Sequence, residues 1–388
     1  MESRTLIQPD VAFISYLKKN GGDTLKKCYQ CASCSVVCAL SPQQEAFPRK
    51  EMISAGWGQK ENLLSDPDIW LCHGCTDCST YCPRGAKPGD VLGAIRSYVI
   101  KFFAFPKFMG LLTQDRKNIL SLLLFPILIL AGVLFAANDG DLSHLYDGEI
   151  IFSKFFPHGI LDPFFIITNI LVYSLAGIGL YKFWKNLKSH KPLNNNKSFM
   201  VVFISTIIGI FSHKDFNQCS TKSSRYWGHL LLFYGFIGAL LTTTLVAVSE
   251  IFFNFPPPIP LESPIKILGN ISGLLMLVGG IVILIRRLST KADKSINTYN
   301  DWLLVVFVLG VAVSGILTQG FRLLEVPVLA YSTYFIHLVF ILYLFWYAPY
   351  SKMAHMFYRT LALVYLKQNR REKKMTIFES FALFFFKL

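Results

Sequence analysis

Apolar residues are spread unevenly along the chain, because long apolar runs dominate everything after about the first hundred residues. A helix needs about 20 mostly apolar residues to cross the ~30 Å hydrocarbon core of a bilayer. Six segments are long enough, the fifth being the shortest: 118–137, 160–184, 226–252, 265–285, 302–317 and 329–350. The pattern therefore predicts six transmembrane helices, since a lipid-embedded backbone must satisfy its own hydrogen bonds.

Two further apolar stretches are too short to span comfortably. Residues 199–211 lie between polar stretches, and residues 377–388 follow a basic run at 367–374. Short amphipathic helices of this kind lie in the membrane interface. We expect neither segment to cross.

Composition agrees with a membrane protein, with 53% hydrophobic and 15% aromatic residues. Lysine and arginine collect in alternate linkers, a distribution that marks the cytoplasmic side. The basic linkers are 182–197, 214–225, 286–294 and the tail from residue 352, and the opposing ones are 138–159, 254–264 and 318–328. Both termini are then cytoplasmic, in a multi-pass protein of the cytoplasmic membrane. The net charge of +14 reflects this topology, with anionic lipid headgroups of the membrane as its partner. We expect no nucleic acid as partner.

Eight of the nine cysteines form two copies of Cys-x2-Cys-x2-Cys-x3-Cys. They are Cys28, Cys31, Cys34 and Cys38, then Cys72, Cys75, Cys78 and Cys82. This spacing is typical of bacterial-type proteins with two [4Fe–4S] clusters, in which the last cysteine of each run ligates the other cluster. A zinc site would need four ligands in two pairs and would have no use for the further cysteine spacing in each run. Disulfides would need an oxidising compartment, and the N-terminus has no apolar core of signal-peptide length.

The usual crossover assigns Cys28, Cys31, Cys34 and Cys82 to cluster one. Cluster two takes Cys72, Cys75, Cys78 and Cys38. Pro83 follows the second run, whereas Ala39 follows the first. The stretch between the runs has room for one or two short helices around residues 50–64. We expect an iron–sulphur domain at 1–105, a transmembrane domain at 106–360 and a basic tail at 361–388.

Histidines in the apolar region are candidate haem ligands. His337 and His355 are eighteen residues apart on the sixth segment, which is five helical turns, so their rings should face the same way about 27 Å apart. His229, at the cytoplasmic start of the third segment, is expected to pair with His355. His158 is expected to pair with His337. His213 competes with His229 or lines a quinone pocket. Taken singly, His158 and His213 could be interfacial, whereas an ionisable residue within an apolar span, such as His229 or His337, is functional by default.

Polar groups at the membrane edges are candidates for a quinone site, where an apolar pocket can meet a proton donor or acceptor. Arg322 and Glu325 lie near the distal face, and Lys222 and Arg225 near the other. Interfacial anchoring is the alternative for each. His73, within the second cysteine run, is most simply a loop residue near a cluster.

The order of two cysteine runs, then six apolar segments with His337 and His355, resembles the third subunit of quinone-interacting membrane-bound oxidoreductase complexes of sulfate reducers. That subunit looks like a fusion of two heterodisulfide reductase proteins, the iron–sulphur protein HdrC and the cytochrome b protein HdrE. The membrane half is similar to nitrate reductase gamma-type cytochrome b. The resemblance covers roughly residues 20–360 and implies an all-α fold, a helical ferredoxin-like head followed by a six-helix cytochrome b bundle. One departure is Ala239, near which that cytochrome b pattern has a further histidine.

The resemblance implies two [4Fe–4S] clusters, two haem b groups and menaquinone as cofactors. Menaquinol would send electrons through haem and clusters to cytoplasmic flavin and iron–sulphur subunits, and finally to adenylylsulfate reductase. The chain would be an electron-transfer subunit of a quinone-linked oxidoreductase. The alternatives are a heterodisulfide reductase-like subunit, another quinone-linked subunit, a transporter, or a haem-less membrane anchor for a soluble redox complex.

Overall fold

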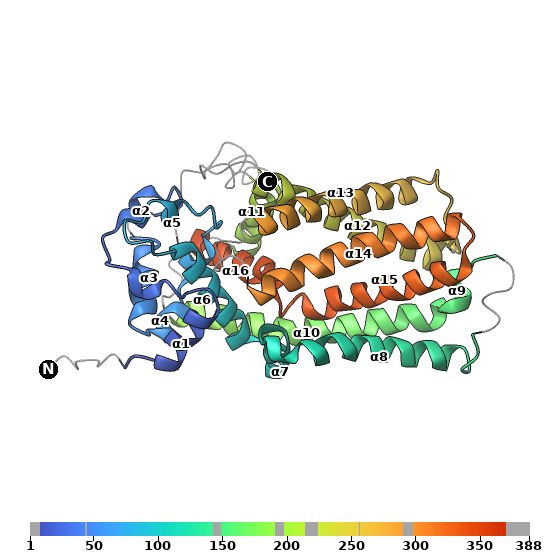
Figure 1. The fold of residues 1–388 in the computed structure, drawn as a ribbon, viewed down its shortest axis with the longest axis horizontal. Helices are drawn as coiled ribbons and strands as arrows, with labels where there is room; N and C mark the ends of the chain where they lie inside the picture. The colour runs from blue at the N-terminus through green and yellow to red at the C-terminus, as the bar shows by residue number, and fades with distance from the viewer. Residues whose placement is uncertain are drawn as a thin grey trace.

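The computed structural model describes residues 8–42, 45–142, 149–190, 198–213, 224–255, 257–289 and 298–369. The described residues form helices, turns and loops without strands, as the all-α prediction requires. A small helical head lies at one end of the molecule, and long, roughly parallel helices extend from it (Figure 1).

The head consists of short helices around the two cysteine runs. They are α1 (Val11–Lys19), η1 (Leu25–Lys27), α2 (Ser33–Val37), α3 (Arg49–Gly56), α4 (Lys60–Leu64), η2 (Pro67–Trp70), α5 (Asp77–Thr80) and α6 (Pro88–Phe103). α3 and α4 confirm the helices predicted between the runs. Asp10 caps α1 by accepting a hydrogen bond from the Phe13 amide at 2.8 Å, which satisfies one of the unpaired donors of its first turn.

The rest of the described chain is dominated by long apolar helices. In order these are α7 (Lys107–Gln114), η3 (Arg116–Asn118), α8 (Ile119–Ala137), α9 (Phe152–Phe155), α10 (His158–His190), α11 (Phe199–Phe211), α12 (Ser224–Phe253), α13 (Pro264–Ser289), α14 (Tyr299–Leu323), α15 (Pro327–Tyr347), η6 (Lys352–Ala354) and α16 (His355–Gln368). Six of them, α8, α10, α12, α13, α14 and α15, are long and apolar enough to cross a membrane, which confirms the six predicted spans.

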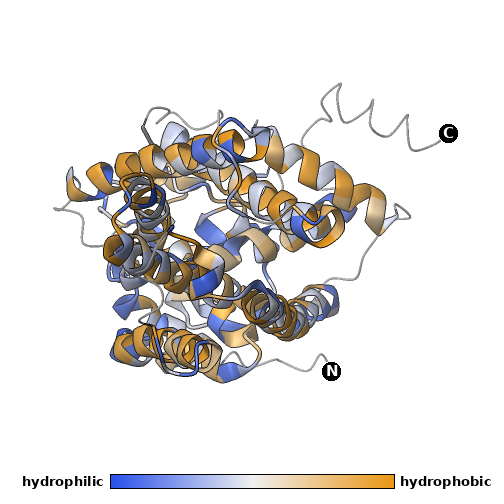
Figure 2. Ribbon diagram, turned by 90° about the vertical axis from the view of Figure 1, so that its right-hand side faces the viewer, coloured by the Kyte–Doolittle hydropathy of each residue, from blue (hydrophilic) through white to orange (hydrophobic). Residues whose placement is uncertain are grey.

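The fifth span is longer than expected, because α14 runs from Tyr299 to Leu323. The short apolar helix at 199–211 is confirmed as α11. Residues 377–388 lie outside the described residues. In a view along the long axis, hydrophobic residues make up much of the helix ribbons (Figure 2), as expected for a bundle that meets lipid.

The expectation of one continuous sixth helix is wrong. α15 ends at Tyr347, a turn and η6 follow, and α16 begins at His355. Pro349 lies in this break, and a proline removes a helical hydrogen bond and disfavours helical backbone in the residue before it. His337 and His355 are therefore on different helices, so five uninterrupted turns do not relate them.

A proline also shapes α8. Pro126 lies inside this helix and cannot donate to the carbonyl of Leu122, four residues earlier. The Tyr347 hydroxyl of α15 donates to that carbonyl at 3.0 Å. In lipid such a replacement is needed, because no water can reach the freed oxygen. The pair ties α15, the helix that carries His337, to α8.

The core of the head is completed by the membrane part. Phe183 and Leu187 of α10, with Tyr358, Ala362 and Tyr365 of α16, are buried in the same apolar cluster as Trp70. Trp70 stacks on Tyr358 with ring centroids 5.7 Å apart. Head and bundle therefore share one hydrophobic core.

Candidate functional site

The two cysteine runs fold into similar loops. In each, the second and fourth residues after the first cysteine have positive φ: 60° and 68° at Gln30 and Ala32, 63° and 73° at Gly74 and Thr76. Alternation of this kind turns successive amides into one concavity that suits an anion. The Gly74 amide donates to the Cys72 sulphur at 3.1 Å. The backbone is thus arranged to receive thiolate and sulphide sulphur.

The four cysteines predicted for cluster two are brought together. Cys38 of the first run lines the same pocket as Cys72, Cys75 and Cys78 of the second. Burial raises the pKa of Cys38 to about 11 and that of Cys78 to about 12, and neighbouring thiols add to both shifts. Iron binding must displace these protons, which couples cluster assembly to pH. This grouping fits a cubane held across the two runs; the ligand assignment stays a prediction.

The cysteines predicted for cluster one lie closer to the surface. Cys31 is exposed, and a hydrogen bond from Ser33 lowers its pKa. Cys34 is partly buried. Burial is the main cause that raises its pKa, and the neighbouring thiol of Cys28 is the second. Cys82 is also partly buried. The two predicted clusters therefore have different environments, one enclosed and one open.

A single cavity of about 3780 Å³ extends from the head through the bundle. Typical ligand pockets are about 300–1,000 Å³, so this space suits more than one large prosthetic group. All five candidate histidines line it: His158, His213, His229, His337 and His355. His73 of the second cysteine run lines it too. The cavity thus joins the candidate haem ligands to the loop of cluster two.

His337 is held firmly by α14. The Ser314 hydroxyl donates to the Gly310 carbonyl and lies 3.0 Å from His337 Nδ1, so Nδ1 carries the proton that the hydroxyl oxygen accepts. A Cβ at Gly315 would lie 2.9 Å from His337 Cε1. A glycine and a serine thus fix the ring, leaving Nε2 with its lone pair for a metal.

His355 has the same tautomer. Its Nδ1 lies 2.6 Å from the Lys352 carbonyl, which can only accept, so Nε2 again keeps the lone pair. Burial lowers the pKa of His355 to about 4, so the ring is neutral at pH 7, as a metal ligand must be. One turn later Arg359 lies 3.2 Å from the ring nitrogens of His73. α16 thus connects a candidate haem ligand to the residue beside Cys72.

His229 and His213 are neighbours, with ring centroids 5.6 Å apart. Gly228 places α12 against α13, because a Cβ there would lie 3.1 Å from Val282 and Ile283. His213 Nδ1 lies 3.0 Å from the Phe211 carbonyl. The pairing of His229 with His355 stays a prediction, with His213 as its competitor.

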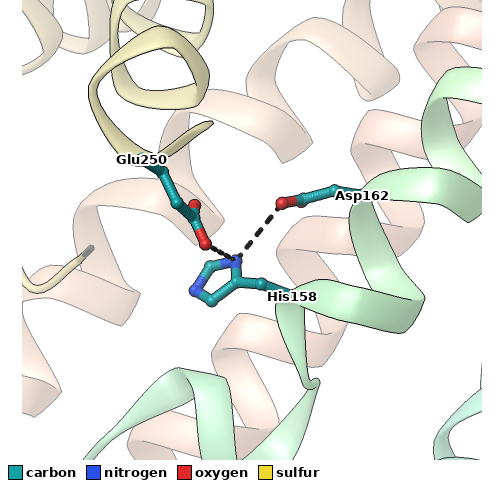
Figure 3. Close-up of side chains that lie close together, drawn as sticks. All are labelled: His158, Asp162 and Glu250. Atoms are coloured by element: carbon teal, nitrogen blue, oxygen red, sulfur yellow. Dashed lines mark ion pairs between the residues drawn. The ribbon is translucent and has the colours of Figure 1, made fainter. Parts of the chain in front are cut away.

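His158 lies at the start of α10 between two carboxylates (Figure 3). Its Nδ1 is 3.5 Å from Asp162 of the same helix and 3.4 Å from Glu250 of α12. These are ion-pair distances, and Nδ1 makes no hydrogen bond to either carboxylate. Both carboxylates were missed from the sequence, although Asp162 stands at the i+4 position that faces His158 on a helix.

The predicted quinone residues divide in two. Arg322 and Glu325 line the large cavity, together with Lys266 and Tyr334, which the sequence interpretation missed. Lys222 lies outside the described residues, and Arg225 is the second residue of α12, with a side chain that is also outside them. Only the distal pair is therefore placed at the cavity.

The head with two cysteine runs, joined to six membrane-type helices, defines a membrane-type iron–sulphur protein. A model of the 4Fe-4S dicluster domain matches residues 24–86, which supports two [4Fe–4S] clusters. A model of citrate utilization protein B matches residues 112–376, and the chain belongs to this family. No solved structure matches.

Individual relatives match different parts. Citrate utilization protein B of Escherichia coli is 24% identical over 371 residues, 90% of this chain and 92% of that protein. The HdrC-type component of the H(2):CoB-CoM heterodisulfide,ferredoxin reductase of Methanothermobacter marburgensis is 34% identical over 92 residues, 24% of this chain and half of that protein's length. The HdrE-type component of the dihydromethanophenazine:CoB–CoM heterodisulfide reductase of Methanosarcina thermophila is 25% identical over 200 residues, 48% of this chain and 73% of that protein.

These matches support the expected relation to the heterodisulfide reductase proteins HdrC and HdrE. The names of these relatives give them as subunits of reductases. The narrower resemblance to the third subunit of quinone-interacting complexes stays a prediction.

Proposed function

We propose that the protein carries electrons between menaquinol in the membrane and water-soluble flavin and iron–sulphur subunits, through two haem b groups and two [4Fe–4S] clusters. One observation carries the proposal: a single cavity is lined by five histidines of the bundle and by His73 beside Cys72. A route for electrons needs redox centres in close succession, and this cavity provides one continuous space for them.

The residues fit haem as follows. His229 with His355 would hold the haem nearer the head, and His158 with His337 the distal one. His337 and His355 would bind through Nε2, because Nδ1 of each ring faces Ser314 or the Lys352 carbonyl. Haem, when bound, supplies one-electron chemistry. The chain's part is to orient the rings and keep them unprotonated.

The quinol site is proposed at the distal end of the cavity, near Arg322 and Glu325. Quinol oxidation releases two protons along with two electrons, so acceptors for protons are needed there. Glu325, together with Asp162 and Glu250 beside His158, offers such acceptors. Lys222 and Arg225 remain the candidates for a site at the opposite edge.

The proposed topology puts both termini, the head and the partner subunits in the cytoplasm, with domains at 1–105, 106–360 and 361–388. In a sulfate-respiring cell the terminal acceptor would be adenylylsulfate reductase. A second candidate follows from the E. coli relative, whose name assigns it to citrate utilization and which aligns over 90% of this chain. In that setting the same relay would serve a soluble partner of citrate metabolism.

The test is a visible spectrum of the purified protein, followed by one substitution. Paired b-type haem bands should appear on reduction, and His355→Ala should remove one haem and stop menaquinol from reducing the clusters. His213→Ala is the matched control and should leave both haems in place if His229 is the ligand. Iron–sulphur absorption without haem bands, or cluster reduction that survives His355→Ala, rejects the proposed route. The cluster signals after menaquinol addition are read by electron paramagnetic resonance.

A further inference from the structure

Three metal-ligating side chains meet where α10 begins and α12 nears its end: His158, Asp162 and Glu250 (Figure 3). Their ligand atoms all lie within 4.8 Å of one another. His158 and Asp162 are four residues apart on one helix and share a face, whereas Glu250 comes from a second helix. Zinc sites are often built on two ligands at positions i and i+4 of one helix.

The distances in this group fit a metal better than a hydrogen bond. His158 Nδ1 lies 3.5 Å from Asp162 Oδ2 and 3.4 Å from Glu250 Oε1, and this buried nitrogen makes no hydrogen bond. An N–H···O hydrogen bond has its donor and acceptor about 2.7–3.2 Å apart. Zinc binds nitrogen and carboxylate oxygen at about 2.0–2.2 Å, so two ligands at the tetrahedral angle lie about 3.4 Å apart. Both distances therefore match the edge of a zinc tetrahedron.

The two carboxylates also need a cation. Asp162 and Glu250 belong to helices that are long and apolar enough to cross a membrane, where acidic side chains require a partner. Within the part of the chain that the structure describes, neither is ion-paired with a lysine or an arginine, although Lys266 and Arg322 line the same large cavity as His158. A divalent cation would balance both carboxylates, whereas the one proton that His158 can add would balance a single one.

We infer that His158, Asp162 and Glu250 form a site for one zinc-type divalent cation, with His158 binding through Nδ1 and water completing the tetrahedron. Magnesium is a poorer occupant, because it demands near-ideal octahedral geometry and oxygen ligands. The cation ties the start of α10, which packs on α15, to α12, which packs on α13. Its binding involves no electron transfer.

The inference goes beyond the proposed function and competes with one part of it. A neutral histidine has a lone pair on one ring nitrogen and a proton on the other. When Nδ1 binds zinc, Nε2 of His158 keeps the proton and is not available to the iron of the distal haem. Zinc also occupies Asp162 and Glu250, which are proposed as proton acceptors for quinol. Zinc is therefore expected to inhibit quinol oxidation at the distal end.

The test uses the full-length protein in detergent and Zn²⁺ as the probe, with the iron–sulphur clusters loaded so that their cysteines are occupied. One zinc per chain should remain after gel filtration. X-ray absorption at the zinc edge should show nitrogen and oxygen ligands at about 2.0–2.2 Å, and no sulphur at the ~2.3 Å expected of a stray cysteine. Asp162→Asn and Glu250→Gln keep the shape of the side chain and should each weaken zinc binding at least about tenfold. Glu262→Gln, the same change in the loop between α12 and α13, should leave it unchanged.

Thermal unfolding gives a second measurement. Zinc should raise the melting temperature of the unchanged protein and of Glu262→Gln, because a ligand of the folded state stabilises it, and should not raise that of Asp162→Asn. Mg²⁺ at the same concentration should have no effect, and iron and sulphide content shows that each variant keeps its clusters. Zinc held by sulphur, or equal zinc affinity in all four proteins, overturns the inference.

The haem count separates this inference from the proposed electron route. Zinc retained together with two haems supports the cation site and rejects His158 as a haem ligand. Two haems without retained zinc overturn the cation site and leave the electron route standing.

Discussion

Gly315→Ala is expected to disturb His337 directly. The added Cβ would lie 2.9 Å from His337 Cε1 and 3.3 Å from Nδ1. Favourable carbon contacts begin near ~3.5 Å, so ring or helix must yield by about 0.6 Å. Overpacking of this kind costs about 1–3 kcal/mol. Because Ser314 holds the ring from the same helix, rotation away from the methyl group also strains the hydrogen bond to Nδ1.

The matched control is Gly177→Ala in α10, where an added Cβ meets nothing within 4 Å. Both changes gain about the same helix propensity, up to ~1 kcal/mol, so their difference isolates the contact with His337. Thermal unfolding in detergent should show Gly315→Ala melting a few degrees below Gly177→Ala.

Redox titration of the haem bands gives the second readout. Gly315→Ala should shift the midpoint potential or low-spin signal of one haem, and Gly177→Ala should shift neither. If the two variants melt together and have the same spectra, the reasoning about this glycine is refuted. If Gly315→Ala lowers stability but leaves every haem signal unchanged, His337 is a packed histidine and not a ligand.

Two other predictions concern the head. Cys38→Ser should lower non-haem iron from about eight to about four atoms per chain through loss of cluster two. Cys38 belongs to the first run, but it shares a pocket with three cysteines of the second. Loss of the cluster one signal instead would contradict the crossover. Arg359→Gln should lower the midpoint potential of cluster two, because a positive charge beside His73 stabilises the reduced cluster. Arg359→Lys keeps the charge and should show a smaller shift. Equal potentials in the unchanged protein and both variants would show that this arginine is structural.

Much of the architecture could be predicted from local pattern. The six spans depend on length and apolarity alone, and α8 to α15 contain them. The cysteine spacing likewise predicts the loop, because a cubane needs thiolates from a tight turn. The backbone added what the residue types could not: Gln30 and Ala32 repeat the positive φ of Gly74 and Thr76, so similar loops form without similar residues.

Less of the candidate site could be predicted from the sequence. Eighteen residues separate His337 and His355, and that spacing suggests one helix until Pro349 is taken into account. Ser314 and Gly315 could not be assigned to His337, because their contact depends on how α14 crosses α15. Asp162 was open to prediction from the i+4 rule, whereas Glu250 comes from another helix and needed the tertiary structure.

The shared core has a consequence for biogenesis. Trp70 and its neighbours emerge from the ribosome early, yet Tyr358, Ala362 and Tyr365 that cover them are made nearly three hundred residues later. The cysteine loops thus acquire their final packing only after the last span has been inserted. We therefore expect metal loading of this chain to be a late event, because a nascent chain cut short before α16 lacks the side chains that complete the core of the head.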